Sequence, residues 1–323
     1  MECGAGIVLG PNQYGKAEVR LLHVDRRTPT HEITDLNLSI ALTGDLAGTH
    51  LTGDNTNVLT TDAQKNAVYA IARRHGVAPI EEFGRRLGRH FTGIGPIDRA
   101  RVRIEEYGWR RIDVGGTPHP HAFERLGGIR VASVHTRADG SADGSAGGRA
   151  GSSPDRGAGR HIEVAVGIDD LVLLKSTGSE FHGFLRDEYT TLAPTEDRIL
   201  ATAVRARWRL ASLDVDWDAS FLGARTALVE AFATTHSLSL QQTLYAMGEA
   251  VLAARPEVCE VRLSLPNNHH FLVDLVPFGL DNPGTVFYAA DRPYGLIEGA
   301  VRRSQVPPAD PDHDWTVMTV GRR

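Results

Sequence analysis

The sequence predicts an α+β fold made of two modules that share one order of elements. Polar and apolar residues alternate over 14–25 and 32–45, as expected for strands with one buried face. The segment 138–159 is almost entirely Gly, Ser, Ala, Asp and Arg, a composition that buries too little apolar surface to fold. We therefore expect a first module over 1–137, a flexible linker or loop insertion over 138–159, and a second module over 160–323.

The first half continues from its two strands into two helices. The cluster Thr60-Thr61-Asp62 is typical of a helix N-terminus, because side-chain oxygens at such positions accept hydrogen bonds from the first backbone N–H groups. The other elements expected here are a short helix from about 79 to 87 and strands at 99–113 and 121–136.

The second half repeats this order, starting with a strand in which Ile162, Val164 and Val166 alternate with other residues. The elements expected after it are a long strand or hairpin arm at 198–217, helices at 219–235 and 239–254, and strands at 257–276 and 284–290. Two units of strand, strand, helix, helix, strand, strand indicate a duplication. Antiparallel strands with both helices on one face leave open sheet edges, so we expect an oligomer that covers them.

The bulk composition excludes several classes of protein. The 323 residues carry a formal net charge of −5, whereas a nucleic-acid-binding domain needs clustered basic residues. No run approaches about 18 apolar residues, so no transmembrane helix is expected. The N-terminus has no signal-peptide pattern, the C-terminus has no peroxisomal address, and two cysteines make a poor disulfide framework. We expect a cytoplasmic, bacterial protein.

Lysine is rare in this chain. Of the 35 basic residues, only Lys16, Lys65 and Lys175 are lysines. Arginine stays protonated, whereas lysine can release its proton near neutral pH when its surroundings lower its pKa. The three lysines are therefore candidates for proton transfer.

A set of short segments spans nearly the whole chain in order. They are Tyr14-Gly15-Lys16, Asp54-Asn55-Thr56-Asn57-Val58, Thr61-Asp62 with Lys65-Asn66, Phe83-Gly84, His90-Phe91, Leu174-Lys175-Ser176-Thr177, the run from Phe181 to Leu192, Asp197-Arg198-Ile199-Leu200, Leu240 to Tyr245, and Leu265 to His269. Together these segments resemble the uricase family, and the run that begins at Phe181 is long enough to be specific by itself.

The resemblance implies two tandem tunnelling-fold (T-fold) modules that assemble as a homotetramer around a barrel-like tunnel. It also implies a urate oxidase, an oxidoreductase of purine catabolism that converts urate, dioxygen and water to 5-hydroxyisourate and hydrogen peroxide without a cofactor. The sequence has neither the GxGxxG of a dinucleotide site nor the HExxH of a zinc site. The pairs His119/His121 and His269/His270 lack a third ligand at a recognisable spacing, so we expect no metal.

Urate is a planar anion, so its site needs a flat surface, a cation and partners for the ring edges. The resemblance assigns stacking to Phe181, bidentate binding to Arg198, and paired donor and acceptor contacts to Gln241. Leu240 and Asp62 are expected to contribute backbone N–H groups. Taken alone, Phe181 fits a core position, Arg198 a solvated strand and Gln241 a helix start.

The resemblance also implies a proton relay of Lys16, Thr61 and His269 that helps to deprotonate urate, since a lysine among polar groups can accept a proton. Thr61 and Asn267 are expected to hold dioxygen or a water above the stacked ring. Both have ordinary alternatives, Thr61 as a helix cap and Asn267 as a turn residue after Pro266.

The resemblance further implies active sites at protomer interfaces. Lys16, Thr61 and His269 are expected from one protomer, and the neighbouring protomer is expected to supply Phe181, Arg198 and Gln241.

Three alternatives remain open. Another T-fold enzyme would act on a purine or pterin ring, and some of those use zinc and a glutamate anchor in place of the pair Arg198 and Gln241. A catalytically silent T-fold protein would bind a purine without turnover. A purely structural oligomer would bind no purine.

Overall fold

The computed structural model describes residues 6–138 and 160–306. The linker expected over 138–159 lies outside the described residues except for Ala138, which ends a strand. The described residues form two compact units, one within 1–126 and 130–166, the other of 127–129 and the chain from Gly167 onward. Each unit combines antiparallel strands with helices, so the α+β class is confirmed.

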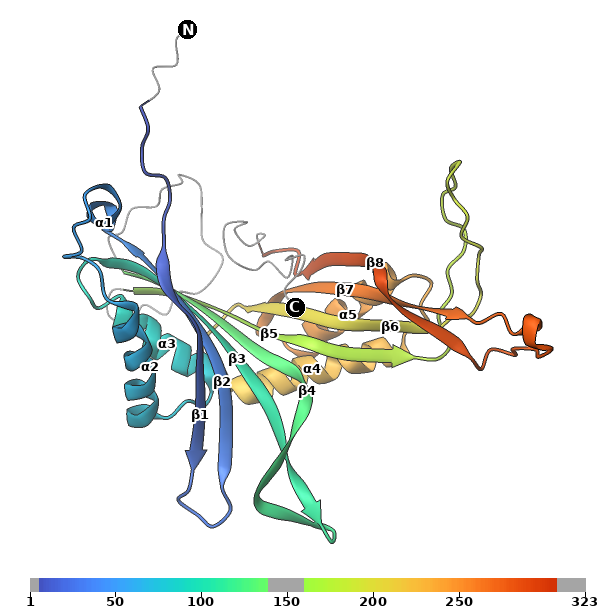
Figure 1. The fold of residues 1–323 in the computed structure, drawn as a ribbon, viewed down its shortest axis with the longest axis horizontal. Coiled ribbons are helices and arrows are strands. Elements are labelled where there is room, and N and C mark those ends of the chain that lie inside the picture. The colour runs from blue at the N-terminus through green and yellow to red at the C-terminus, as the bar shows by residue number, and fades with distance from the viewer. Residues whose placement is uncertain (1–5, 139–159, 307–323) are drawn as a thin grey trace. The chain divides into compact units, whose positions relative to one another are not determined.

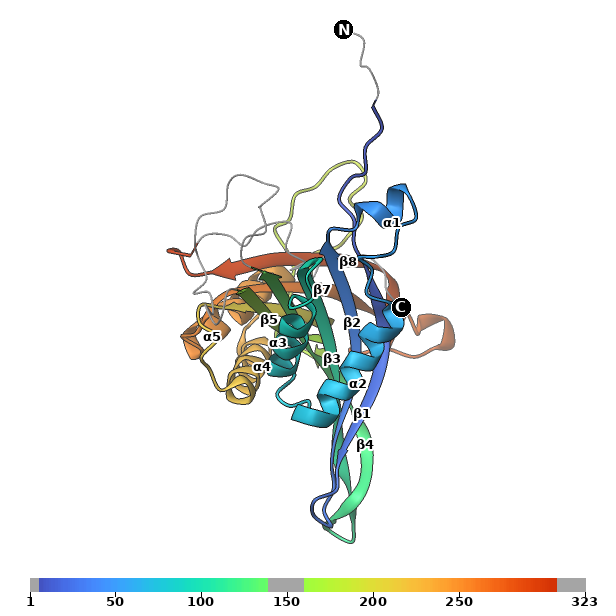
Figure 2. The same cartoon turned by 90° about the vertical axis from the view of Figure 1, so that its left-hand side faces the viewer.

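The first unit carries the strands and helices from β1 to β4 (Figure 1). Its elements are β1 (Tyr14–Asp25), β2 (Glu32–Gly44), α1 (Ala47–Leu51), α2 (Thr61–His75), α3 (Ile80–Phe91), β3 (Ile97–Val114) and β4 (Thr117–Ala138). The strands follow one another in chain order, and β2 pairs antiparallel with both β1 and β3. Helix α2 packs on β1 and α3 on β3 (Figure 2).

The second unit has the same order of elements. They are β5 (Arg160–Lys175), whose first residues belong to the first unit, β6 (Leu200–Leu210), α4 (Trp217–Thr234), α5 (Leu240–Ala254), β7 (Val258–Leu272), the 3₁₀ turn η1 (Val276–Phe278) and β8 (Phe287–Arg302). Strand β7 pairs antiparallel with β6 and β8, and α5 packs on β7 and β8. Strands β5 to β8 also follow chain order.

The core of the first unit lies between its strands and its two longer helices. Every second residue of β2, from Leu36 through Leu38 and Ile40 to Leu42, is buried there together with Phe83 of α3. This is the alternation expected of a strand with one buried face. The core therefore fixes which side of β1 and β2 faces the helices.

Two glycines allow α3 to lie close against β4. A Cβ on Gly84 would lie 2.6 Å from Val134 Cγ2, and a Cβ on Gly88 would lie 2.1 Å from Thr136 Oγ1. One helical turn along α3 thus corresponds to two residues along β4, which is about 6 Å in both elements.

The second unit repeats this stagger between α5 and β8. A Cβ on Gly248 would lie 2.6 Å from Val301 Cγ2, while Leu244, one turn earlier, lies against Gly299. The two units therefore share packing geometry as well as element order.

Strand β6 is shorter than expected. The sequence predicted a strand or hairpin arm over 198–217, but β6 ends at Leu210. A turn follows, in which the Asp214 N–H donates to Ser212 Oγ, and Asp216 then caps α4. These polar side chains bind nearby backbone groups and so end the strand locally.

Strand β8 is longer than expected. The sequence predicted it over 284–290, yet it pairs with β7 as far as Arg302. Pro293 and Gly295 are poor strand formers, but cross-strand pairing resumes at Gly295. Two smaller differences are that α3 continues to Phe91 and that the five-residue α1 was not foreseen. No helix in the described residues is long and apolar enough to cross a membrane.

Candidate functional site

Lys16 lies on the core face of β1 because this strand carries a β-bulge. Lys16 is opposite Ile40 and Val19 is opposite Leu38, with a register shift between the two pairs. Directly opposite residues of an antiparallel pair share a face, and Ile40 and Leu38 are buried in the core. Residues three apart in a regular strand point to opposite faces, so the extra residue of the bulge turns Lys16 toward the helices.

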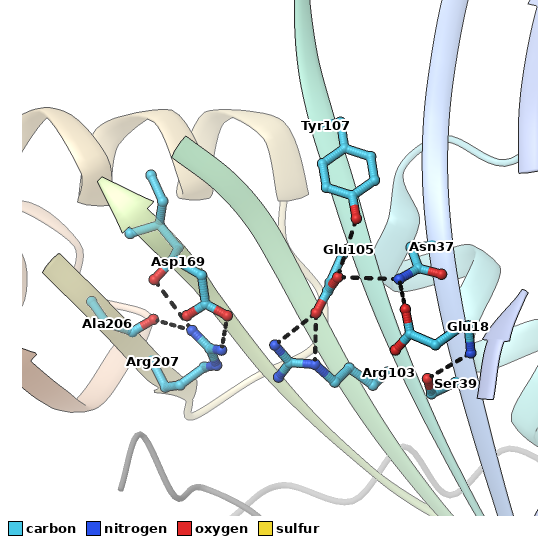
Figure 3. A network of polar contacts seen from close by, with 10 residues as sticks. Glu18, Asn37, Ser39, Arg103, Glu105, Tyr107, Asp169, Ala206 and Arg207 are labelled. Atoms are coloured by element: carbon cyan, nitrogen blue, oxygen red, sulfur yellow. Dashed lines mark hydrogen bonds and ion pairs between the residues drawn. The ribbon is translucent and has the colours of Figure 1, made fainter. Parts of the chain in front are cut away.

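Polar contacts hold the bulge from the opposite face of the sheet (Figure 3). Glu18 has a positive φ of 58°, a strained conformation for this residue, and its N–H donates to Ser39 Oγ at 3.2 Å. The buried Asn37 donates from Nδ2 to Glu18 Oε2 at 2.5 Å and to Glu105 Oε2 at 3.4 Å. Arg103 in turn donates to Glu105 Oε1. This network fixes the bulge and therefore the direction of Lys16.

Helix α2 begins beside this strand, and Thr60 is its cap. Thr60 Oγ1 accepts a hydrogen bond from the Ala63 N–H at 3.1 Å, and the Thr60 carbonyl accepts the first helical bond, from Gln64. The interpretation of Thr61 as the cap is therefore wrong. Thr61 is the first helical residue and exposed, and the N–H groups of Thr61 and Asp62 precede the first helical bond.

The carboxylate of Asp62 is held along its own helix. Lys65 Nζ donates to Asp62 Oδ1 at 2.6 Å, and Asn66 Nδ2 donates to Oδ2 at 2.9 Å. The hydrogen bond from Lys65 is the main cause that lowers the pKa of Asp62, and the charge of Lys16 lowers it further. Lys16 therefore lies near the start of α2.

Phe181 and Arg198 lie side by side in the second unit. Arg198 Cζ is 5.2 Å from the centroid of the Phe181 ring, which also stacks on Phe184 at 5.1 Å. Phe181 exchanges two backbone hydrogen bonds with Thr195, and the Arg198 N–H donates to the Ser179 carbonyl at 2.8 Å. Burial lowers the pKa of the Arg198 guanidinium, which remains charged at neutral pH. The pair offers a planar anion a ring face and a cation.

Helix α5 begins with a cap of the same kind as α2. Ser239 Oγ accepts from the Gln242 N–H at 3.2 Å, and Gln242 Oε1 accepts from the Leu238 N–H at 2.8 Å. This pair of contacts resembles a capping box. The Leu240 side chain is buried, and the Gln241 side chain is exposed at the second helical position. The N–H groups of Leu240 and Gln241 have no partner within the helix.

The start of α5 is directed toward the end of β7 that carries Asn267. Leu244 of α5 lies against Gly299 of β8. Leu240 is one helical turn earlier in α5, so it lies about two residues further along β8 in the direction of Gly295. Asn267 is opposite Gly295, roughly 7 Å further along the sheet. The interpretation of Asn267 as a turn residue is wrong, because it lies inside β7.

His269 lies beyond an irregularity of β8. Asn267 pairs with Gly295 and His269 with Ala290, so residues 291–294 of β8 stand opposite Asn268 alone. Burial is the main cause that lowers the pKa of His269, and the charges of Arg198 and His270 lower it further. His269 therefore lies near Arg198 of its own protomer. This proximity favours a grouping of His269 with Arg198, in place of the expected grouping of His269 with Lys16 and Thr61.

The other two lysines have structural roles. Lys65 is paired with Asp62. Lys175 Nζ donates to the Thr235 carbonyl at the end of α4 and lies 5.7 Å from the Phe232 ring centroid. Burial lowers the pKa of Lys175. Lys16 lies on β1 beside the start of α2, whereas Lys65 lies in that helix start and is bound to Asp62. Within the described ranges, no group of three His, Cys, Asp or Glu side chains is placed to hold a metal ion.

Two supporting contacts were not apparent from the sequence. The Tyr14 hydroxyl donates to the Leu59 carbonyl at 3.0 Å and ties β1 to the approach of α2. Glu180 contacts both His182 and His236. Tyr14 stood in the Tyr-Gly-Lys segment without an assigned role. The contact of Glu180 with His236 joins segments far apart in the chain, for which the sequence carries no local signal.

The candidate residues thus fall into two groups according to their unit, and we call these groups half-sites. The first half-site consists of Lys16, Thr61 and Asp62, and the second half-site of Phe181, Arg198, Leu240, Gln241, Asn267 and His269.

Comparison with known proteins identifies the family. A family model described as Uricase matches residues 12–130 and 164–298. A uricase of Arthrobacter globiformis is 51% identical over 302 residues, which cover 93% of this chain and 91% of that protein. This chain belongs to the uricase family. A uricase of Dictyostelium discoideum is 37% identical over 297 residues, which cover 91% of this chain and 96% of that protein.

The uricase fold is shared as well. The crystal structure of uricase from Arthrobacter globiformis matches with a TM-score of 0.84 at 50% identity, and the match covers 95% of this chain and 99% of that chain. The expected T-fold is therefore confirmed. The matched ranges of the uricase family model include every residue of both half-sites.

Proposed function

We propose that this chain is a urate oxidase that converts urate, dioxygen and water to 5-hydroxyisourate and hydrogen peroxide without a metal or organic cofactor. Membership of the uricase family supports the reaction class, an oxidoreductase acting on urate. The proposed site is supported above all by the position of Arg198 beside Phe181, in the same unit as Gln241 and His269.

The second half-site recognises the substrate. The Phe181 ring stacks on the planar purine, and the Arg198 guanidinium binds two adjacent acceptors of the anion. The exposed Gln241 amide meets a ring edge that alternates donor and acceptor. The Leu240 N–H, at the start of a helix, adds a donor where the helix dipole favours negative charge.

The first half-site handles protons. Lys16 accepts a proton from the urate monoanion through the Thr61 hydroxyl, since Lys16 lies beside the start of α2 and Thr61 is the first residue of that helix. The deprotonated urate is electron-rich and transfers electrons to dioxygen, which Asn267 and Thr61 hold above the ring. His269, kept neutral by burial and by Arg198, accepts or returns protons on the peroxide side.

The two half-sites meet between protomers of a homotetramer. One protomer supplies Lys16, Thr61 and Asp62, and its neighbour supplies the second half-site. Large apolar side chains around the end of the β7–β8 hairpin support an oligomer, since Val276 is 76% exposed, Phe278 74% and Tyr288 63%. The modules that assemble are a first T-fold module over 1–137 and a second over 160–323.

The direct test mixes metal-stripped protein with urate in air and follows urate absorbance, oxygen uptake and peroxide release together. We expect urate and oxygen to disappear in equal amounts while peroxide forms. Binding of urate without turnover would instead identify a silent purine-binding protein, and absence of binding would leave a structural oligomer. Activity that returns only with added zinc would contradict the cofactor-free reaction.

A test of the shared site mixes two inactive variants. Lys16→Met and Arg198→Ala are each unfolded, mixed in equal amounts and refolded together. If each site takes one half from each of two protomers, random mixing restores about one site in four. Separately refolded variants combined afterwards serve as the control. No recovery in co-refolded, correctly assembled protein would place both halves within one protomer.

A further inference from the structure

Glu180 forms a bridge between two histidines next to the proposed urate site. His182 Nε2 lies 2.6 Å from Glu180 Oε2, and His236 Nε2 lies 2.6 Å from Glu180 Oε1. The Glu180 side chain is only 17% exposed, whereas His182 and His236 are 54% and 61% exposed. Both carboxylate oxygens are therefore engaged, one by each ring.

The two histidines have different positions relative to the site. His182 belongs to the same short segment as Glu180 and Phe181, so its contact is local. His236 belongs to the segment between α4 and α5, three residues before the Ser239 cap. The contact between Glu180 and His236 therefore links the segment of Phe181 to the start of the helix that carries Gln241.

Backbone hydrogen bonds run alongside this link. The Glu180 N–H donates to the Ser237 carbonyl at 2.8 Å, and the Ser237 N–H donates to the Gly178 carbonyl at 3.0 Å. Ser237 Oγ also accepts from the Thr243 hydroxyl at 2.8 Å, inside the first turns of α5. The backbone sets the two segments side by side, and the side-chain bridge lies at the outer edge of this pairing.

We propose that Glu180 is a positioning residue that, through His236, holds the Phe181 ring at the correct place relative to Gln241 at the start of α5. The proposal rests on the assignment of Phe181 and Gln241 to the urate site. A planar ligand that stacks on one residue and pairs its edge with another needs both at a fixed offset, and a small displacement weakens binding.

The charge of Glu180 supports this role. Hydrogen bonds from His236 and then from His182 lower the pKa of Glu180, so the side chain is a carboxylate near neutral pH. Hydrogen bonds to an ionised acceptor are stronger than neutral ones. Glu180 is therefore a strong hydrogen-bond acceptor for both rings near neutral pH.

The test compares three histidine variants in the assembled enzyme. We measure urate binding under nitrogen, where turnover has no oxidant, together with KM, kcat and Tm in air. His236→Ala is expected to raise Kd and KM for urate about tenfold with kcat changed less than about twofold, because a hydrogen bond to a charged group is lost. His236→Gln, which keeps an N–H donor, is expected to restore most of the affinity. His182→Ala is the matched control and is expected to have a smaller effect.

Two results would overturn the proposal. One is an unchanged Kd in His236→Ala and in Glu180→Ala. The other is a parallel fall in Tm and kcat that His236→Gln does not rescue. Such a fall would mean that the bridge has a structural role alone. Phe181→Ala, measured in parallel, distinguishes failure of the positioning role from failure of the proposed urate site. An unchanged Kd in Phe181→Ala would remove Phe181 from the urate site.

Discussion

The starts of α2 and α5 use the same backbone arrangement for different chemistry. At both, a hydroxyl of the residue before the helix caps the third N–H group, Thr60 in α2 and Ser239 in α5. Both therefore present the N–H groups of their first two residues at the positive end of a helix dipole. Lys16 lies beside the first helix start, whereas the second belongs to the unit that holds Arg198 and Phe181.

The side chain at the second helical position shows the difference. The Asp62 carboxylate is bound to Lys65 and Asn66, so only its backbone N–H is proposed to meet a ligand. Gln241, at the equivalent position of α5, is exposed and directed by no such pair. A capped helix start thus supplies generic anion binding, and the neighbouring residues decide whether it serves proton transfer or recognition.

The largest expected effect tests the proton-transfer half. Lys16→Met should lower kcat by about 10²–10⁴ and leave KM for urate nearly unchanged, because it removes an acid–base group while the recognition half stays intact. Steady-state kinetics measure both constants. Lys65→Met is the control, since Lys65 lies in the same helix start but pairs with Asp62. Unchanged kcat in Lys16→Met would contradict the relay.

The next effect tests the recognition half. Arg198→Lys keeps the positive charge but loses the planar fork, so kcat/KM should fall by roughly 10² with KM raised. Kinetics at several urate concentrations separate the two constants. A variant with a lower kcat at unchanged KM would move Arg198 from recognition to proton transfer.

Removal of the stacking face should have a moderate effect. Phe181→Ala is expected to raise KM for urate about tenfold, since an aromatic contact and its buried area are lost. Phe184→Ala is the matched control, because Phe184 stacks on Phe181 rather than forming the proposed face of the site. If the two variants had equal KM values, the stacking surface would not be specific to Phe181.

The pH dependence tests the link between Arg198 and His269. The pKa of His269 is lowered, so the ring is neutral at neutral pH and gains a proton only as the pH falls through that lowered pKa. If neutral His269 is required, kcat falls on the acid side at that pKa. Arg198→Gln removes one cause of the lowering, so the acid limb of kcat at saturating urate should move to higher pH. If the acid limb stayed at the same pH, the protonation of His269 would not be its cause.

Local signals made the helix starts predictable from sequence. The Thr60-Thr61-Asp62 cluster at the start of α2 and the alternation in β2 act within a few residues, and the helix and the strand lie where they were expected. The placement of Lys16 was not predictable, because the bulge is fixed by Ser39 and Asn37 of the neighbouring strand. Alternation alone puts Lys16 on the face opposite Val19.

Contacts between distant segments account for the other differences. His269 near Arg198 and Glu180 bound to His236 each depend on how separate segments pack, and neither segment marks its partner. The expected grouping of His269 with Lys16 was made without knowledge of its proximity to Arg198. Residue types and motif order indicated the chemistry of the candidate site, whereas the placement of His269 beside Arg198 required the fold.

The smallest expected effect separates structure from chemistry at neighbouring residues of α2. Thr60→Ala should lower the free energy of unfolding by about 1 kcal/mol, because the Ala63 N–H loses its cap, and should leave kcat nearly unchanged. Thr61→Ala should change stability by less than about 0.5 kcal/mol, as is usual at an exposed site, yet lower kcat. Denaturant unfolding and steady-state kinetics on the same preparations measure both quantities. If Thr61→Ala destabilised the protein as much as Thr60→Ala, the Thr61 hydroxyl would belong to the cap rather than to the site.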